Sequence, residues 1–236
     1  MNPLLLVMIV FAAAFTQSFT GFGLSLVAMP LLTRMVSIRT ASAFLSPVAI
    51  TAQALLLLRY RQTVNLRAIG PLLTTSWIGV WLGIVGLQHV HEGIVTALLG
   101  IVIVGYALYA LFTPRLPEIK DRRWAYLFGF LGGILSGAYN ASGPPVVIYG
   151  TCRHWEPIEF KSNLQVFFLF NTFLVNVIRI LNRDYTAQTL QGYFIVLPAL
   201  VIGLLAGSSL DRWLNPTVFR KIVLWLLIAL GVQLIF

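Results

Sequence analysis

The 236-residue chain is 58% apolar and only 10% charged, whereas soluble domains carry about 25% charged residues. This composition excludes an ordinary soluble domain and indicates an all-α polytopic membrane protein, with the lipid bilayer as its partner. The formal charge of +9 would suit a nucleic-acid binder, but the basic residues stand singly or in small groups between apolar runs. That distribution is typical of membrane-protein loops, so we expect no nucleic-acid partner.

The first element, residues 3–34, is too long for one crossing of the bilayer and too short for two. A continuous helix of about 30 residues would rise about 45 Å, against a hydrocarbon core of about 30 Å. The run is also interrupted by a polar, glycine-containing stretch at residues 16–23. Such a break at membrane depth is tolerated where protein or water satisfies the backbone, so we predict a re-entrant helical hairpin with the break at its tip.

Three apolar segments then follow, each long enough to cross a membrane: residues 41–58, 68–88 and 93–112. A polar linker at residues 114–123 separates them from a second long element, residues 124–153. That element is broken at residues 136–145, where Gly, Asn, Ser and two prolines gather. Three more spans complete the chain, at residues 164–181, 190–210 and 217–236.

The order of elements is therefore the same in both halves, and the sequences match weakly. Gly143 follows Gly23 by 120 residues, and Gly203 follows Gly79 by 124. We predict one membrane domain made of an N-terminal repeat (1–113), a cytoplasmic linker (114–123) and a C-terminal repeat (124–236). A hairpin leaves on the side it entered, so each repeat crosses three times and the second repeat is inverted. Inverted repeats with broken helices are typical of secondary transporters.

The charges favour this topology. It places 4 of the 16 Lys and Arg residues on one side and the remaining 12 on the other, against a split of 7 to 9 if each long element crossed fully. The positive-inside rule puts the richer side in the cytoplasm, so both termini are expected to be periplasmic or extracellular. The four residues on the outer side are Arg34, Arg39, Arg179 and Arg183.

The two breaks hold most of the candidate substrate-binding residues. Their side chains bring hydrogen-bond donors into an apolar setting, their glycines let backbone approach a ligand, and a helix beginning after each break would favour an anion. These residues are Thr16, Gln17, Ser18, Thr20, Gly21, Gly23, Asn140, Ser142, Gly143 and Pro144. Gln53, Gln165 and Asn171 lie in or near spans and are further candidates. The structural alternative is that the break residues only satisfy the interrupted backbone, and that the span residues only bridge helices.

No Asp or Glu lies deep inside a predicted span. A carrier of cations coupled to protons usually needs a buried carboxylate, so this pattern favours a small anionic or neutral substrate. The sequence shows no metal-ligand cluster and no nucleotide-binding motif, and we expect no cofactor. An integral membrane enzyme would need a cluster of His, Asp, Glu or Cys near one face, so we do not expect an enzyme.

The run Phe19-Thr-Gly-Phe-Gly-Leu-Ser-Leu-Val-Ala-Met-Pro resembles the start of the TauE/SafE family of membrane transporters, the sulfite exporters. Gly143-Pro-Pro-Val-Val and Ile202-Gly-Leu-Leu-Ala-Gly are similar to that family's second repeat. The resemblance covers nearly the whole chain. It implies a secondary transporter, in the inner membrane of a bacterial cell, for a sulfur-containing anion such as sulfite, sulfoacetate or a thiosulfate-like ion.

Two alternatives of function stay open at this point. The chain could form an anion channel, or it could be a permease for another small organic anion. Assembly into a homo-oligomer is also open, as are the direction of transport and the coupling ion.

Overall fold

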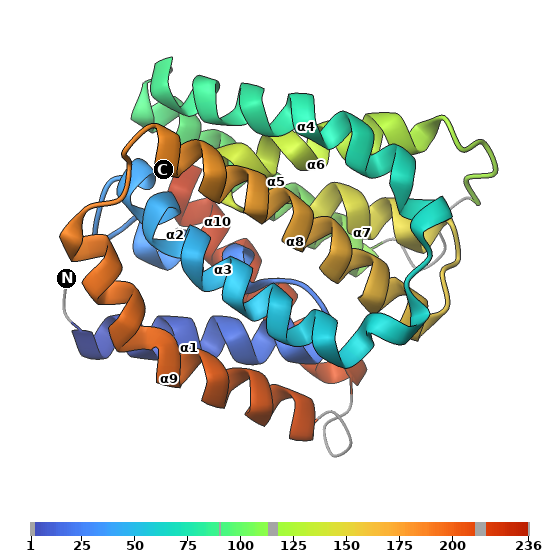
Figure 1. Cartoon of the computed structure of the whole chain (residues 1–236). Coiled ribbons are helices and arrows are strands. Elements are labelled where there is room, and N and C mark those ends of the chain that lie inside the picture. Colours follow the sequence, from blue (N-terminus) through green and yellow to red (C-terminus); the bar gives the residue numbers. More distant parts are fainter. Residues whose placement is uncertain (1–2, 90, 113–117, 211–215, 236) are drawn as a thin grey trace. The chain divides into compact units, whose positions relative to one another are not determined.

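A computed structural model describes residues 3–89, 91–112, 118–210 and 216–235, and within them the chain is helical with no strand (Figure 1). The described elements are α1 (Pro3–Thr20), α2 (Leu24–Leu32), α3 (Ile38–Tyr60), the 3₁₀ turn η1 (Arg61–Thr63), α4 (Leu66–His89), α5 (Glu92–Phe112), α6 (Trp124–Tyr139), α7 (Gly143–Cys152), α8 (Pro157–Leu181), α9 (Ala187–Leu210) and α10 (Pro216–Ile235).

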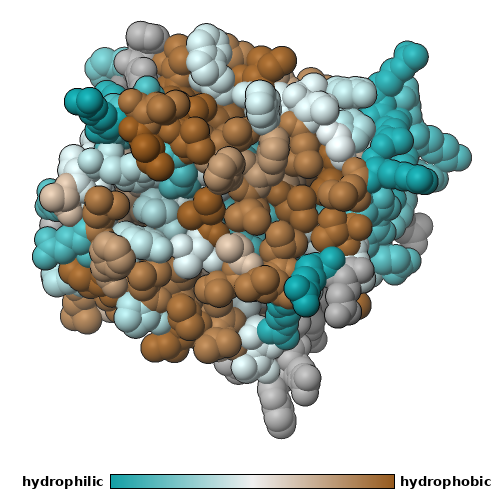
Figure 2. Space-filling view, viewed as in Figure 1, coloured by the Kyte–Doolittle hydropathy of each residue, from teal (hydrophilic) through white to brown (hydrophobic). Residues whose placement is uncertain are grey.

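Each predicted span corresponds to one helix, namely α3, α4, α5, α8, α9 and α10. Among the described residues, five helices are long and apolar enough to cross a membrane: α1, α3, α4, α8 and α9. Shorter apolar stretches occupy residues 97–112 and 124–139. The chain is a multi-pass membrane protein, and Figure 2 shows apolar side chains over much of its visible face.

Both predicted breaks are present, but each begins later than the polar residues suggested. Helix α1 continues to Thr20, and the hydroxyls of Thr16 and Thr20 bond back to the carbonyls four residues earlier, at 2.9 and 2.8 Å. A threonine in a helix interior commonly bonds in this way, so its hydroxyl is satisfied without ending the helix. The 18 residues of α1 rise about 27 Å, so this arm is longer than a half-crossing hairpin requires.

The chain forms two compact units, and each draws elements from both sequence halves. Unit 1 comprises Met1–Val48, Val90–Pro114 and Tyr185–Phe236; unit 2 comprises Ala49–His89 and Arg115–Asp184. The predicted repeat boundaries describe sequence relationship, which is a different division, and they stay a prediction. Residues 113–117 of the linker region lie outside the described residues.

In unit 2, α6 and α7 form a helical hairpin that returns to the end where it began. Ile119, just before α6, donates its N–H to the carbonyl of Cys152 at 2.9 Å, at the end of α7. The Arg153 guanidinium donates to the carbonyls of Ile119 and Lys120, at 2.8 and 3.0 Å. The chain therefore enters and leaves this hairpin at one end of the unit, as the sequence predicted. In unit 1, α2 packs against α1 after the first break in the same manner.

Glycines lie at close helix contacts in both units. In unit 2, α4 and α6 run side by side (Figure 1), with Gly79 against the carbonyl of Phe130 and Gly83 against that of Ile134. In unit 1, α9 runs beside α1 in the same way. A Cβ atom at Gly203 would lie 2.7 Å from the Phe11 carbonyl oxygen.

These contacts repeat one arrangement, because the glycine pair of a span packs on the hairpin helix of the other half in both units. In each case the two helices run parallel, since later residues of one meet later residues of the other. Helices that lack side chains at the contact can approach closely, which is the usual packing of membrane helices.

Candidate functional site

The first break lies between α1 and α2, in unit 1. Gly21 and Gly23 have φ angles of 85° and 116°, in the left-handed region that favours glycine. Gly23 is the N-cap of α2, and Gln17 Oε1 accepts the N–H of Leu24 at 3.0 Å. The buried Gln17 side chain therefore satisfies one of the amides at the start of α2.

The other polar side chains of this break also have partners within the protein. Ser18 donates to the carbonyl of Leu204 on α9 at 2.7 Å, so it joins α1 to α9. Thr16 and Thr20 are occupied by their back-bonds, and the Thr20 hydroxyl also contacts the Phe22 carbonyl. Each of these four side chains thus bonds within the protein, and a part in substrate binding stays a prediction.

What the first break presents to a ligand is backbone. Ser25 and Leu26 stand in the first turn of α2, and amides of a first turn have no carbonyl partner within their own helix. Both residues are buried, at 7% and 2% exposure. The positive end of the α2 dipole adds to the attraction for an anion there.

The second break lies between α6 and α7, in unit 2. Asn140 takes a left-handed conformation, φ 54° and ψ 24°, and its N–H bonds to the Ser136 carbonyl at 2.8 Å. The N–H of Ala141 reaches the Leu135 carbonyl at 3.1 Å, which completes the capping of α6. Asn140 and Ser142 are buried, at 5% and 4% exposure.

Helix α7 begins at Gly143 with prolines in its first turn, as the sequence predicted. Pro144 and Pro145 have no N–H, so Gly143 carries the one amide hydrogen among the first three helical residues. Binding of an anion at this helix start stays a prediction. Its donors are the amides of Ser142 and Gly143 and the side chains of Asn140 and Ser142. Hence the first break offers chiefly backbone, and the second offers chiefly side chains.

The candidates in the spans, Gln53, Gln165 and Asn171, are all buried in unit 2. Asn171 Nδ2 donates to the Phe167 carbonyl at 2.8 Å. The amide oxygens of Gln53 and Asn171 have no hydrogen-bond partner in the protein. The candidate residues thus fall into two groups: residues 16–23 in unit 1, and the other seven in unit 2. The meeting of the two breaks stays a prediction.

Two features of unit 2 were missed as candidates. Ser136 lies at 1% exposure within α6, and its hydroxyl has no partner in the protein. Arg179, which the sequence placed at the outer surface, is 1% exposed and forms an ion pair with Asp184 at 3.4 Å. A signal for Arg179 was available, because it stands four and eight residues after the buried Val175 and Asn171 and so shares their helix face.

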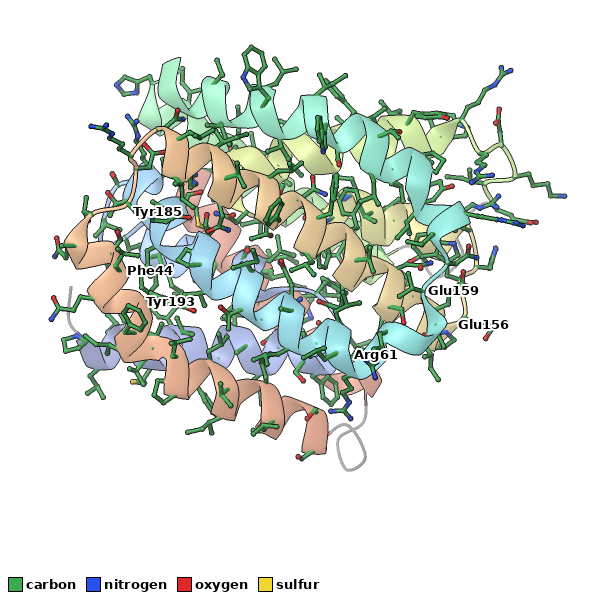
Figure 3. The ribbon with its side chains drawn as sticks, in the orientation of Figure 1. Phe44, Arg61, Glu156, Glu159, Tyr185 and Tyr193 are labelled. Carbon is green, nitrogen blue, oxygen red and sulfur yellow. The ribbon has the colours of Figure 1, made fainter. Side chains whose placement is uncertain are left out.

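One end of unit 2 gathers basic residues. Several contacts locate this end: Ser162 Oγ bonds to the Tyr60 carbonyl at 2.6 Å, Asn163 Oδ1 accepts the Asn65 N–H at 2.9 Å, and Arg122 reaches the Arg67 carbonyl. Arg61, Glu156 and Glu159 also lie here (Figure 3), and hydrophilic residues gather over this end in Figure 2. Its basic residues are Arg59, Arg61, Arg67, Lys120, Arg122, Arg123, Arg153 and Lys161. All of them belong to the side predicted to be cytoplasmic.

Each half of the chain has a polar break, and a helix with a buried start follows each break. Matching glycine contacts occur in both units. Residues 6–234 match the family described as sulfite exporter TauE/SafE. The chain belongs to the TauE/SafE sulfite exporter family. This match confirms the resemblance found in the sequence, over nearly the whole chain.

Individual relatives agree with this assignment. A probable sulfite/organosulfonate exporter TauE of Cupriavidus necator is 25% identical over 229 residues, covering 94% of this chain and 90% of its own length. A probable inner membrane transporter protein TsaS of Comamonas testosteroni is 25% identical over 179 residues, covering 75% and 74%. A probable membrane transporter protein of Haemophilus influenzae is 32% identical over 127 residues, covering 47% and 50%. No solved structure matches the chain.

Proposed function

We propose that this family member is a secondary transporter of a small sulfur-containing anion, such as sulfite or an organosulfonate. The observation that carries the proposal is the buried start of α2, with first-turn amides that lack a partner in their own helix, inside a chain of the TauE/SafE family. The names of the relatives from Cupriavidus necator and Comamonas testosteroni support a membrane transporter and, for the former, a sulfur anion.

The chemistry of the two breaks suits a sulfur oxyanion. Sulfite and sulfonates present three oxygens on one sulfur, and each accepts hydrogen bonds without donating any. Amides of Ser25 and Leu26 would bind oxygens at one break, and Asn140, Ser142 and the Gly143 amide at the other. A charge-assisted hydrogen bond contributes about 1.5–3 kcal/mol. An anion of the wrong shape would leave buried donors unpaired, which gives the site its selectivity.

The proposed transport cycle rests on the inverted repeats that the sequence predicts. The two breaks would approach the bilayer midplane from opposite faces, hold the anion between them, and open to one side and then the other. The repeated glycine contacts support this cycle, because α4–α6 and α1–α9 would each move as a tightly packed pair. We place the basic end of unit 2 in the cytoplasm by the positive-inside rule, in the inner membrane of a bacterial cell.

Labelling tests this orientation. A Lys120→Cys variant in a Cys152→Ser background should react with a membrane-impermeant maleimide only after the membrane is opened. Lys120 is suitable because its side chain is 83% exposed. Reaction in intact cells would reverse the proposed topology.

An uptake panel tests the function. Proteoliposomes holding the purified protein should take up sulfite, sulfoacetate, thiosulfate, sulfate and taurine to different extents, with saturable flux for a sulfur oxyanion. Counterflow, in which internal unlabelled anion accelerates entry of labelled anion, should be present. Flux that does not saturate and shows no counterflow would indicate the alternative function, an anion channel. Absence of flux for every sulfur anion would refute the proposal.

A further inference from the structure

Two buried oxygens of unit 2, Ser136 Oγ on α6 and Asn171 Oδ1 on α8, have no hydrogen-bond partner in the protein. Their residues are 1% and 0% exposed, so bulk water does not solvate them. The amide of Asn171 has a defined orientation, since its Nδ2 donates to the Phe167 carbonyl at 2.8 Å and its oxygen is the atom left over. Buried polar atoms are normally satisfied, so these two oxygens call for a ligand.

The helix register brings these oxygens to one place. Helices α6 and α8 begin at the same end of unit 2, and Gly132 faces the Phe167 ring: a Cβ at Gly132 would lie 3.2 Å from Phe167 Cζ. Ser136 and Asn171 each stand four residues further along, one turn on and on the same helix faces. They therefore occupy adjoining turns of two packed helices, just before the break that ends α6 at Tyr139.

A third acceptor lies at the same level. Gln53 Oε1 in α3 is also buried without a partner. The Ser162–Tyr60 hydrogen bond of 2.6 Å marks a common level of α3 and α8, and residues 49–60 and α8 both extend from that end toward the other end of the unit (Figure 1). At 1.5 Å per residue, Gln53 lies about 10 Å and Asn171 about 13 Å from that level. The three oxygens thus share one depth in unit 2.

The donor set determines the kind of ligand. All three atoms are neutral oxygens, and the nearby end of α6 is the negative end of its dipole. Neutral oxygens beside a helix C-terminus suit a hard cation of low charge, as in transporters whose broken helices coordinate Na⁺. A divalent ion or a proton would call for a carboxylate. The acidic residues of unit 2, however, stand at its ends: Glu118, Asp121, Glu156, Glu159 and Asp184.

We propose that Ser136, Asn171 and Gln53 form a Na⁺ site directly behind the second break. The inference rests on the proposed function in one respect: a cation here would lie next to the anion expected at Ser142 and Gly143, so that each ion favours binding of the other. The Na⁺ site would then supply the coupling ion of the transporter.

The test measures binding without transport. The purified full-length protein is unfolded thermally in increasing NaCl, with choline chloride keeping the ionic strength constant. We expect a saturable stabilisation by Na⁺. Ser136→Ala and Asn171→Leu should each raise the NaCl concentration needed for half of this effect by about tenfold or more, because each removes one charge-assisted contact.

Two variants on neighbouring positions serve as matched controls. Ser76→Ala removes a buried hydroxyl that already bonds to the Leu73 carbonyl at 2.9 Å, and Asn176→Leu removes an amide that bonds to the Thr172 carbonyl at 2.7 Å. Both should keep the Na⁺ response of the wild type. Equal melting of the wild type in NaCl and choline chloride, or an unchanged Na⁺ response in Ser136→Ala and Asn171→Leu, would overturn the proposal. Na⁺ binding without flux of any sulfur anion would refute the proposed function and leave this site standing.

Discussion

The contact between α4 and α6 leads to a sharp prediction about two glycines three residues apart on α4. A Cβ atom at Gly83 would collide with the carbonyl oxygen of Ile134 and lie 3.0 Å from the amide nitrogen of Ala138. Both obstacles are backbone atoms, which cannot rotate away. At Gly86, by contrast, an added Cβ meets no atom within 4 Å.

Alanine should therefore have opposite effects at these positions. Gly83→Ala forces α4 and α6 apart, and overpacking of this kind costs about 1–3 kcal/mol. Gly86→Ala meets no obstacle and gains up to about 1 kcal/mol from helix propensity. The two variants should thus differ by about 1–4 kcal/mol, or on the order of 2–16 °C in melting temperature.

Thermal unfolding of both variants in one detergent, at one scan rate, measures this difference. In the other unit, Gly207→Ala should be destabilised like Gly83→Ala, because its Cβ would lie 2.5 Å from the Phe15 carbonyl oxygen. If Gly83→Ala melted at or above Gly86→Ala, the close approach of α4 and α6 would be refuted. The argument that these helices move as one pair would then fail as well.

Two further substitutions probe buried polar contacts. Gln17→Leu leaves the Leu24 amide without its acceptor and should lower the free energy of unfolding by about 1–3 kcal/mol. Thr74→Ala removes an exposed hydrogen bond to the Pro71 carbonyl and should change the melting temperature little. Equal melting of the two variants would contradict the capping role of Gln17. Arg179→Met removes the cation that pairs with the buried Asp184 carboxylate and should lower the free energy of unfolding by about 3–5 kcal/mol. Adding Asp184→Leu should recover much of this loss. A double variant that melts below Arg179→Met would show that the ion pair is not what Arg179 contributes.

The sequence was most informative where one physical requirement acts over many residues. Crossing a bilayer takes about 20 apolar residues, so the apolar runs located each long helix. The breaks were also predictable, because Gly, Pro and Asn stop helices, but their starts were not. The predicted breaks included Thr16, Thr20 and Ser136, but these residues lie within helices. The helix backbone accepts hydrogen bonds from the hydroxyls of Thr16 and Thr20.

What depends on a partner in another part of the chain could not be predicted. The matching positions of Gly79 and Gly203 indicated a repeat, but they did not show that Gly79 meets α6 or that Gly203 meets α1. Burial of Arg179 and Ser136 likewise depends on what surrounds each side chain. The composition of the second break suggested an anion-binding helix start, and this stays a prediction.

The central claim is that the two breaks hold the transported anion, and Gly143 tests it most directly. Gly143 is not among the residues with positive φ, so a side chain there does not face left-handed backbone strain. We predict that Gly143→Val folds but does not transport, because its side chain blocks the approach of an anion to the start of α7. Gly105→Val is the control, since no atom lies within 4 Å of a Cβ there.

The measurement is the initial rate of labelled sulfite or sulfoacetate uptake into proteoliposomes, per amount of folded protein. Gly105→Val should transport near the wild-type rate, and Gly143→Val should show none above empty liposomes. A Gly143→Val protein that transports at the wild-type rate would show that the second break is structural.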